Sequence, residues 1–225
     1  MAARQYIAVI ADMVRSRQLS SYRRRAIQGK FGDLINSLNH EYRKTIAAKF
    51  IITLGDEFQG LLNSAALIPD LIWRLDFDFN ERNLRVGVGC GTLDTPLQRY
   101  AINIDGSALH AAREAIDTAK REKTLGGVFC GFGEWGSVLN GIARILWFQR
   151  SGWTPSQREI AQLLRSGMSQ VAIAETLRIR PQVVSRQVQS SGCMQYFAAE
   201  NAWRLIFQKQ IDPLLRNKNG RAKLR

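Results

Sequence analysis

The stretch KFIITLGDEFQGLL, residues 49–62, carries two acidic residues inside a run that otherwise has the composition of buried β-structure. Gly55 followed by Asp56 is a hairpin signal between two apolar strands. The stretch therefore predicts two antiparallel strands, with Asp56 and Glu57 at the turn between them.

Apolar runs and helical spacing predict further strands and helices before and after this hairpin. The expected elements are a strand at 5–13, a helix at 20–46, the two hairpin strands, a helix at 64–75, a strand at 84–93, a helix at 105–122 and a strand at 126–132. This order predicts an α+β fold in which an antiparallel, ferredoxin-like sheet carries its helices on one face. The glycines of GVGCGT (87–92) lack the spacing of a dinucleotide fingerprint, so we interpret them as positions of close packing or of a bulge.

The composition limits the class of protein. The chain has 225 residues, of which 45% are hydrophobic, and this is enough for a sizeable core. Lys and Arg outnumber Asp and Glu by 32 to 19, which favours a polyanionic partner such as nucleic acid. The three cysteines show no CxxC spacing, which argues against a disulfide framework or a zinc site and favours a reducing cytoplasm. The sequence predicts no membrane span.

A change in amino-acid composition along the chain predicts two domains, 1–136 and 137–225. Glycine-bounded apolar runs dominate the first domain, whereas helix-forming Ala, Gln, Leu and Arg dominate the second. The end of the chain is also more basic, since residues 151–225 hold 12 basic and 4 acidic residues. The tail RNKNGRAKLR (216–225) is interpreted either as frayed or as an arm that contacts phosphates.

Two aspartates are candidate metal ligands. Asp12 ends the first strand and Asp56 lies at the turn of the hairpin expected to pair beside it, so the two carboxylates are expected to meet. Mg²⁺ is typically held by one or two carboxylates together with substrate phosphates, and Mn²⁺ accepts the same oxygen ligands. The alternative is that each aspartate is only a turn or cap residue.

Four segments resemble the class III nucleotide cyclases. YIAVIADMVRSR (6–17) is similar to their first strand, and FIITLGDEFQGLL (50–62) to their second metal-binding hairpin and to the GGDEF hairpin of diguanylate cyclases. LRVGVGCGTL (84–93) resembles the strand that follows, and DGSALHAAREAI (105–116) the helix that carries an Asn and an Arg at the transition state. The resemblance implies that Asp12 and Asp56 bind a metal ion with a nucleotide, and that Arg113 neutralises charge on the transferring phosphate.

Two positions depart from the cyclase pattern. Leu109 stands at the position of the catalytic Asn, and Ile52 stands where purine-selective cyclases carry Lys. His110 can face the same site, but it has no acidic partner in the sequence and is given no catalytic role. Over its whole length the chain is more closely similar to the bacterial SatD family, which shares a first strand ending in an acidic residue, ITLGDEFQGLL (52–62) nearly as written here, and DG followed by HxAREAI.

Residues 154–192 have the spacing of a helix-turn-helix and resemble region 4 of sigma factors. Thr154 and Gln157 form a predicted capping box, Gly167 ends the first helix, Ser169 caps the second and Pro181 opens the third. The expected core positions are Ile160, Leu164, Val171, Ala174, Leu177, Ile179, Val184 and Val188. The expected contacts with double-stranded DNA are Arg178, Arg180, Gln182, Val183, Arg186 and Gln187.

These observations support two main hypotheses of different classes. The preferred one is a cytoplasmic, DNA-binding regulator of transcription, in which a cyclase-like domain senses a nucleotide with a divalent metal. A homodimer is compatible with this hypothesis, because residues 194–215 have an apolar face that either closes the core or forms a dimer interface. The alternative is an active Mg²⁺-dependent nucleotidyl cyclase or nucleotidyltransferase with an accessory helix-turn-helix. A third possibility is a purely structural dimerisation module.

Overall fold

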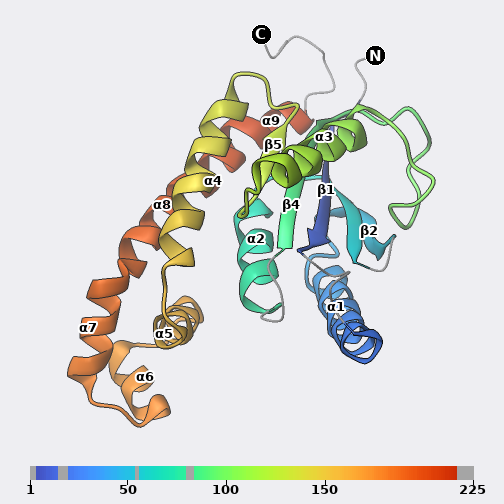
Figure 1. Ribbon diagram of the computed structural model, residues 1–225. Helices are drawn as coiled ribbons and strands as arrows, with labels where there is room; N and C mark the ends of the chain where they lie inside the picture. Colours follow the sequence, from blue (N-terminus) through green and yellow to red (C-terminus); the bar gives the residue numbers. More distant parts are fainter. Residues whose placement is uncertain (1–3, 15–19, 54–55, 80–83, 217–225) are drawn as a thin grey trace. The chain divides into compact units, whose positions relative to one another are not determined.

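A computed structural model describes residues 4–14, 20–53, 56–79 and 84–216. The chain divides into two compact units (Figure 1). The first comprises the residues up to Arg144 together with those from Trp203 onward, and the second comprises Ile145–Ala202. Both transitions fall inside helices, α4 (Trp135–Ser151) and α8 (Cys193–Ile206).

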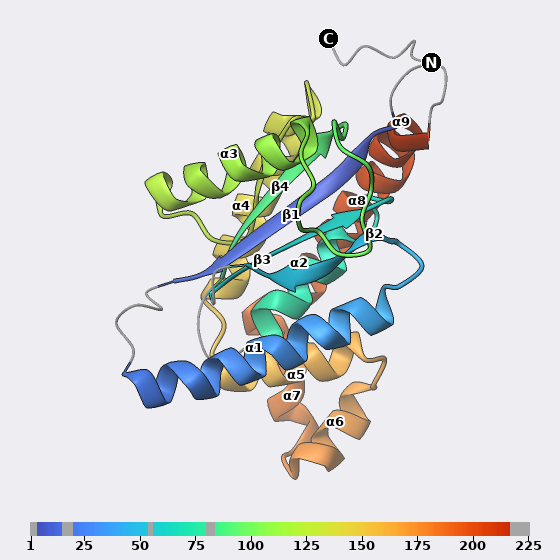
Figure 2. The same cartoon turned by 90° about the vertical axis from the view of Figure 1, so that its right-hand side faces the viewer.

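The first unit is built on one five-stranded sheet, in the order β2-β3-β1-β4-β5 (Figure 2). Its elements follow the predicted order: β1 (Tyr6–Met13), α1 (Ser21–Glu41), β2 (Ile46–Ile52), β3 (Glu57–Leu62), α2 (Ile68–Phe77), β4 (Leu84–Gly91), α3 (Ser107–Glu122) and β5 (Val128–Cys130). The first four strands pair antiparallel, in the ferredoxin-like arrangement, and β5 adds parallel to β4. The predicted α+β fold class is confirmed.

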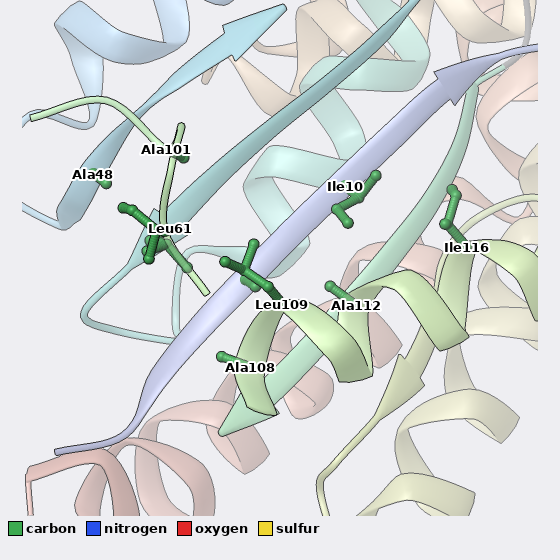
Figure 3. Packing of buried hydrophobic residues seen from close by; sticks show 10 residues of the cluster. Ile10, Ala48, Leu61, Ala101, Ala108, Leu109, Ala112 and Ile116 are labelled. Atoms are coloured by element: carbon green, nitrogen blue, oxygen red, sulfur yellow. The ribbon is translucent and has the colours of Figure 1, made fainter. Parts of the chain in front are cut away.

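Helices cover both faces of this sheet, so the expectation that all of them lie on one face is wrong. Phe31 of α1 packs against Phe58 of β3, with ring centroids 5.6 Å apart. Phe58 pairs in register with Ala11, whereas the cluster on α3 uses the opposite face, through Ala8 and Ile10. Figure 3 shows side chains of α3 beside Ile10 of β1 and Leu61 of β3. Strand β1 is buried on both faces because each of them carries a helix.

Glycines of β4 let α3 lie almost directly on the sheet, which confirms their interpretation as positions of close packing. A Cβ on Gly89 would lie 2.2 Å from the backbone nitrogen of Ala112 and 2.3 Å from the carbonyl oxygen of Ala108. A Cβ on Gly87 would similarly lie 2.5 Å from the backbone nitrogen of Ile116. The missing side chains therefore fix both the depth and the position of α3 along β4.

Residues 203–216 belong to the first unit, which differs from the predicted division at residues 136/137. Trp203 and Phe207 pack against Phe129 of β5, with centroids 5.5 and 6.0 Å away. Asp212 is buried and accepts hydrogen bonds from the Ser64 hydroxyl at 2.6 Å and the Ala65 backbone N–H at 2.5 Å. Trp203, near the end of α8, and Phe207, which begins the π-helical turn η2 (Phe207–Ile211), thus complete the core around β5. Asp212 begins the last described helix, α9 (Asp212–Arg216).

The second unit contains the three predicted short helices, α5 (Pro155–Arg165), α6 (Gln170–Leu177) and α7 (Pro181–Ser191). The capping box of Thr154 and Gln157 is present, and the Ser169 side chain accepts from the backbone N–H of Ala172. Among the expected core positions, Ile160, Ala174, Val184 and Val188 are buried, whereas Leu164, Leu177 and Ile179 are half-buried. Val171 is wrong as a core residue, because it is 58% exposed and Ile173 takes its place.

A hydrogen bond and an ion pair join the helices of the second unit to one another. The Trp153 indole N–H donates to the Ser191 carbonyl oxygen at 2.8 Å, which ties the start of α5 to the end of α7. Arg165 of α5 forms an ion pair with the buried Glu200 of α8. In the part of the chain that the structure describes, every helix is too short or too polar to cross a lipid bilayer.

Candidate active site

A pair of carboxylates lies where β1 ends and β3 begins. Asp12 and Glu57 are directly opposite each other in the antiparallel register, so their side chains point to the same face of the sheet. The Met13 backbone N–H donates to the Asp56 carbonyl oxygen at 2.9 Å and continues the pairing beyond them. Asp12 shares a face with Ala8 and Ile10, which is the face that α3 covers. Both acids therefore meet side chains from α3.

Arg113 of α3 binds Glu57 through two parallel hydrogen bonds. Its Nη1 and Nη2 atoms each lie 2.8 Å from one carboxylate oxygen of Glu57. Glu57 is only 4% exposed, and its Oε1 atom also lies 3.4 Å from the hydroxyl of Thr53. The hydrogen bonds that Arg113 donates to Glu57 raise the pKa of the guanidinium, against the opposing effect of burial. This pair of hydrogen bonds fixes the orientation of the Glu57 side chain.

Asp12 is held between two further cations. Lys120 Nζ lies 3.3 Å and Arg85 Nη1 lies 3.7 Å from its Oδ2 atom. The other oxygen, Oδ1, is buried and has no hydrogen-bond partner. Burial raises the pKa of Asp12, whereas Lys120 and Arg85 act to lower it. Asp12 therefore keeps one oxygen available as a ligand in a partly desolvated position.

Helical spacing explains why α3 supplies two cations to one place. Arg113 and Lys120 are seven residues apart, or two turns, and so lie on the same side of the helix. Lys120 Nζ also lies 3.9 Å from Glu57 Oε2, the atom that Arg113 Nη1 contacts. The two carboxylates thus share a group of three cations: Arg85, Arg113 and Lys120.

The structure brings together two of the residues proposed from the sequence, Asp12 and Arg113. Asp56 precedes β3 by one residue, and Glu57 rather than Asp56 stands opposite Asp12 in the register. Glu57 and Lys120 were missed. The alternation of side chains along the paired strands could have indicated Glu57, and the spacing of seven residues from Arg113 along the helix could have indicated Lys120. His110, in the first turn of α3, has its Nε2 atom 2.8 Å from Oδ1 of Asp105, and both side chains are exposed.

The two departures from the cyclase pattern are both apolar side chains. Leu109 is 8% exposed and belongs to the core between α3 and the sheet, where Figure 3 shows it beside Leu61. Ile52 ends β2 and is half-buried. Neither side chain can donate a hydrogen bond to a base or a phosphate.

The carboxylates suit a divalent cation that is held jointly by the protein and a phosphorylated ligand. Within the described ranges, no group of three or more His, Cys, Asp and Glu residues is placed to hold a metal ion by itself. Two carboxylates are nevertheless the donor set typical of Mg²⁺ sites that are completed by substrate phosphates and water. The buried Oδ1 atom of Asp12, which lacks a hydrogen-bond partner, is consistent with that use.

The residues predicted to contact DNA form an exposed strip on the second unit. Arg178 ends α6 in a left-handed conformation with φ 54°, and Arg180 is the N-cap of α7. The side chains of Arg178, Arg180, Gln182, Val183 and Arg186 are exposed, and Gln187 is half-buried. Within α7, Gln182 and Arg186 lie on the side away from the buried Val184 and Val188, whereas Val183 and Gln187 lie on a flank.

The fold and the site define a mixed α+β domain with an acid pair and three cations at the end of its central strands. The chain belongs to the SatD family, whose model matches residues 6–206. None of the curated proteins matches the sequence.

Two solved structures similar to this chain are cyclases. The structure of a bacterial light-regulated adenylyl cyclase has a TM-score of 0.40 and 11% identity, covering 57% of this chain and 77% of that one. The catalytic core of a rhodopsin-guanylyl cyclase with converted specificity, in complex with ATPαS, has a TM-score of 0.31 and 15% identity, covering 49% and 71%. The likeness is one of fold and does not extend to a function.

Proposed function

We propose that the first unit binds a nucleoside triphosphate with a divalent cation at Asp12 and Glu57 and carries out nucleotidyl transfer on it. The observation that carries this proposal is the convergence of two carboxylates and three cations where β1 and β3 meet α3. A triphosphate with a divalent ion presents both signs of charge within a few ångströms, and such a mixed cluster is complementary to it.

Four residues of the cluster have a direct role in this proposal. Asp12 and Glu57 hold the cation, and Asp12 Oδ1 is the oxygen already available for it. Lys120 turns toward the phosphates while Arg113 stays on Glu57, and the charge of both opposes the negative charge that develops on the transferring group. Mg²⁺ or Mn²⁺, when bound, supplies neutralisation of the phosphate oxygens and orientation of the attacking and leaving groups.

Leu109 and Ile52 cannot bind a nucleobase by hydrogen bonds, so we infer that the site recognises the phosphates of the nucleotide. Leu109 is committed to the core, and Ile52 offers no hydrogen-bond donor or acceptor from its side chain. A conventional purine cyclase uses these positions for the transition state and for the base. We therefore expect weak discrimination among the four nucleobases, with binding set mainly by the length of the phosphate chain.

The proposal is tested by calorimetric titration of the full chain with ATP, GTP, CTP and UTP, each with Mg²⁺ and with Mn²⁺. Each mixture is then resolved by chromatography for new products. We expect binding that needs both the metal and the triphosphate, and a cyclic or oligomeric product from at least one nucleotide. Binding without a product would contradict the transfer step, and no binding with any nucleotide would contradict the whole proposal.

A second candidate function, DNA binding by the second unit, is favoured by the exposed strip on α6 and α7. Three arginines and two glutamines lie on or beside α7, whose inward residues are buried valines. Arg can bind guanine and Gln can bind adenine in the major groove. Under this candidate the resemblance to sigma-factor region 4 reflects a shared way of docking. The first unit then acts as a nucleotide sensor, and two copies of the chain read two half-sites.

Arg186→Ala tests this second candidate. The exposed guanidinium lies on the face of α7 opposite its core, so its removal is expected to weaken binding of a selected duplex by about 1–3 kcal/mol and to relax base preference. Fluorescence anisotropy with a selected and a scrambled duplex measures both effects. Arg144→Ala removes the same charge from an arginine that pairs with Glu122 outside the three helices, and serves as the control. Equal losses in both variants would contradict a reading role for α7.

A further inference from the structure

Lys120 contacts both carboxylates of the candidate site. Its ammonium lies 3.3 Å from Asp12 Oδ2 and 3.9 Å from Glu57 Oε2, and so bridges the two carboxylates. A divalent cation bound by the same two carboxylates, with Asp12 contributing Oδ1, would lie close to this ammonium. Because like charges at such a separation repel strongly in a partly buried place, the ammonium and the cation exclude each other.

We propose that Lys120 is an internal counter-ion that keeps the divalent cation out until a polyphosphate arrives, and then moves from the carboxylates to the phosphates. This inference rests on the proposed function of the same site and specifies how that site is loaded. In the resting protein Lys120 takes the place of the metal ion. In the loaded protein the metal ion takes the carboxylates, and Lys120 takes the phosphates.

The charges of the cluster support this exchange. The two carboxylates already face three cations, so a divalent ion entering alone would leave a large excess of positive charge. A triphosphate brings several negative charges and compensates both the ion and the displaced ammonium. Metal and polyphosphate are therefore expected to bind together, each raising the affinity of the other.

Exposure separates the acids of the site from its cations, and hydrogen bonding separates Lys120 from Arg113. The side chains of Asp12 and Glu57 are 13% and 6% exposed, whereas those of Lys120 and Arg113 are 38% and 44% exposed. Arg113 is fixed to Glu57 by two hydrogen bonds, but Lys120 makes two longer contacts at the end of a flexible four-carbon stem. The lysine can therefore leave the acids at little cost in packing, while the carboxylates stay in place.

Lys120→Gln provides the test, with Arg121→Gln as the matched control. Both changes remove one positive charge from the last turns of α3, but the Arg121 guanidinium donates to Thr118 on its own helix instead of reaching the carboxylates. Two binding reactions are measured on the full chain. Electron paramagnetic resonance follows Mn²⁺ alone, and calorimetry follows inorganic triphosphate in the presence of Mn²⁺.

The two measurements are expected to move in opposite directions for Lys120→Gln. Its affinity for Mn²⁺ alone should rise by about 5- to 100-fold, because the competing charge is gone. Its affinity for triphosphate with Mn²⁺ should fall by roughly tenfold or more, because a charged contact to phosphate is lost. Arg121→Gln should match the wild type in both, and Lys120→Arg should keep the weak affinity for Mn²⁺ alone.

Two results would overturn the inference, and they are distinguishable. If Lys120→Gln binds Mn²⁺ alone no better than the wild type while both bind triphosphate with Mn²⁺, Lys120 is not a competitor and the proposed function survives. If neither protein binds Mn²⁺, with or without triphosphate, the proposed function fails as well. An unchanged far-ultraviolet circular dichroism spectrum shows that each variant is folded.

Discussion

Asp12→Asn is expected to lower nucleotide-dependent Mn²⁺ binding and product formation by roughly 100-fold or more, because it removes an anionic metal ligand. Asn has the same size as Asp, so the register between β1 and β3 should persist. Burial already raises the pKa of Asp12, so the folded protein solvates this carboxylate less well than water does. The neutral amide should therefore leave the melting temperature nearly unchanged.

The measurement combines calorimetry with chromatographic product analysis on the wild type and the variant. Asp33→Asn is the matched control, because Asp33 is an exposed carboxylate of α1, the helix on the other face of the sheet. It should leave binding and product formation unaltered. Full activity of Asp12→Asn would show that the acid pair is not the centre of the chemistry.

Gly89→Ala is the substitution with the largest expected effect on stability. The new Cβ would stand 2.2 and 2.3 Å from backbone atoms of α3, and backbone cannot move aside as the end of a flexible side chain can. We expect a loss of at least about 3 kcal/mol in the free energy of unfolding, because α3 must lift from β4. Denaturant unfolding followed by circular dichroism measures this loss.

Gly29→Ala is the matched control for this prediction. Gly29 lies on the exposed side of α1, and a Cβ there meets no atom within 4 Å. Because alanine favours a helix interior more than glycine does, this change should raise stability by up to about 1 kcal/mol. Similar destabilisation by both substitutions would contradict the close approach of α3 to β4.

Local sequence signals were sufficient to predict the order of elements, because each depends on neighbouring residues. Gly55 and Asp56 marked the hairpin, and Thr154, Ser169 and Pro181 marked the starts of α5, α6 and α7. The covering of both faces was missed, although YIAVIA (6–11) contains the evidence. A nearly continuous apolar run is typical of a strand that is buried on both faces, whereas alternating apolar and polar residues are typical of a strand with one solvent-exposed face.

The candidate site could be predicted only in part, because its geometry depends on contacts that are distant in the sequence. The register across the hairpin decides that Glu57 opposes Asp12, and the residues between the strands do not reveal it. Lys120 becomes a neighbour of Asp12 only once the rotation of α3 on the glycines of β4 is known. Val171 was placed wrongly because the eight-residue helix QVAIAETL has apolar or small residues on several sides.

The return of the chain at Trp203 determines when the first unit can be completed during synthesis. Phe129 leaves the ribosome well before Trp203 and Phe207, the aromatic residues that cover it. At the usual rate of roughly 5–20 residues per second, the nascent sheet waits several seconds with that part of its core open. Residues 145–202 emerge entirely within this interval, so the helical unit has the opportunity to fold before the sheet that precedes it is closed.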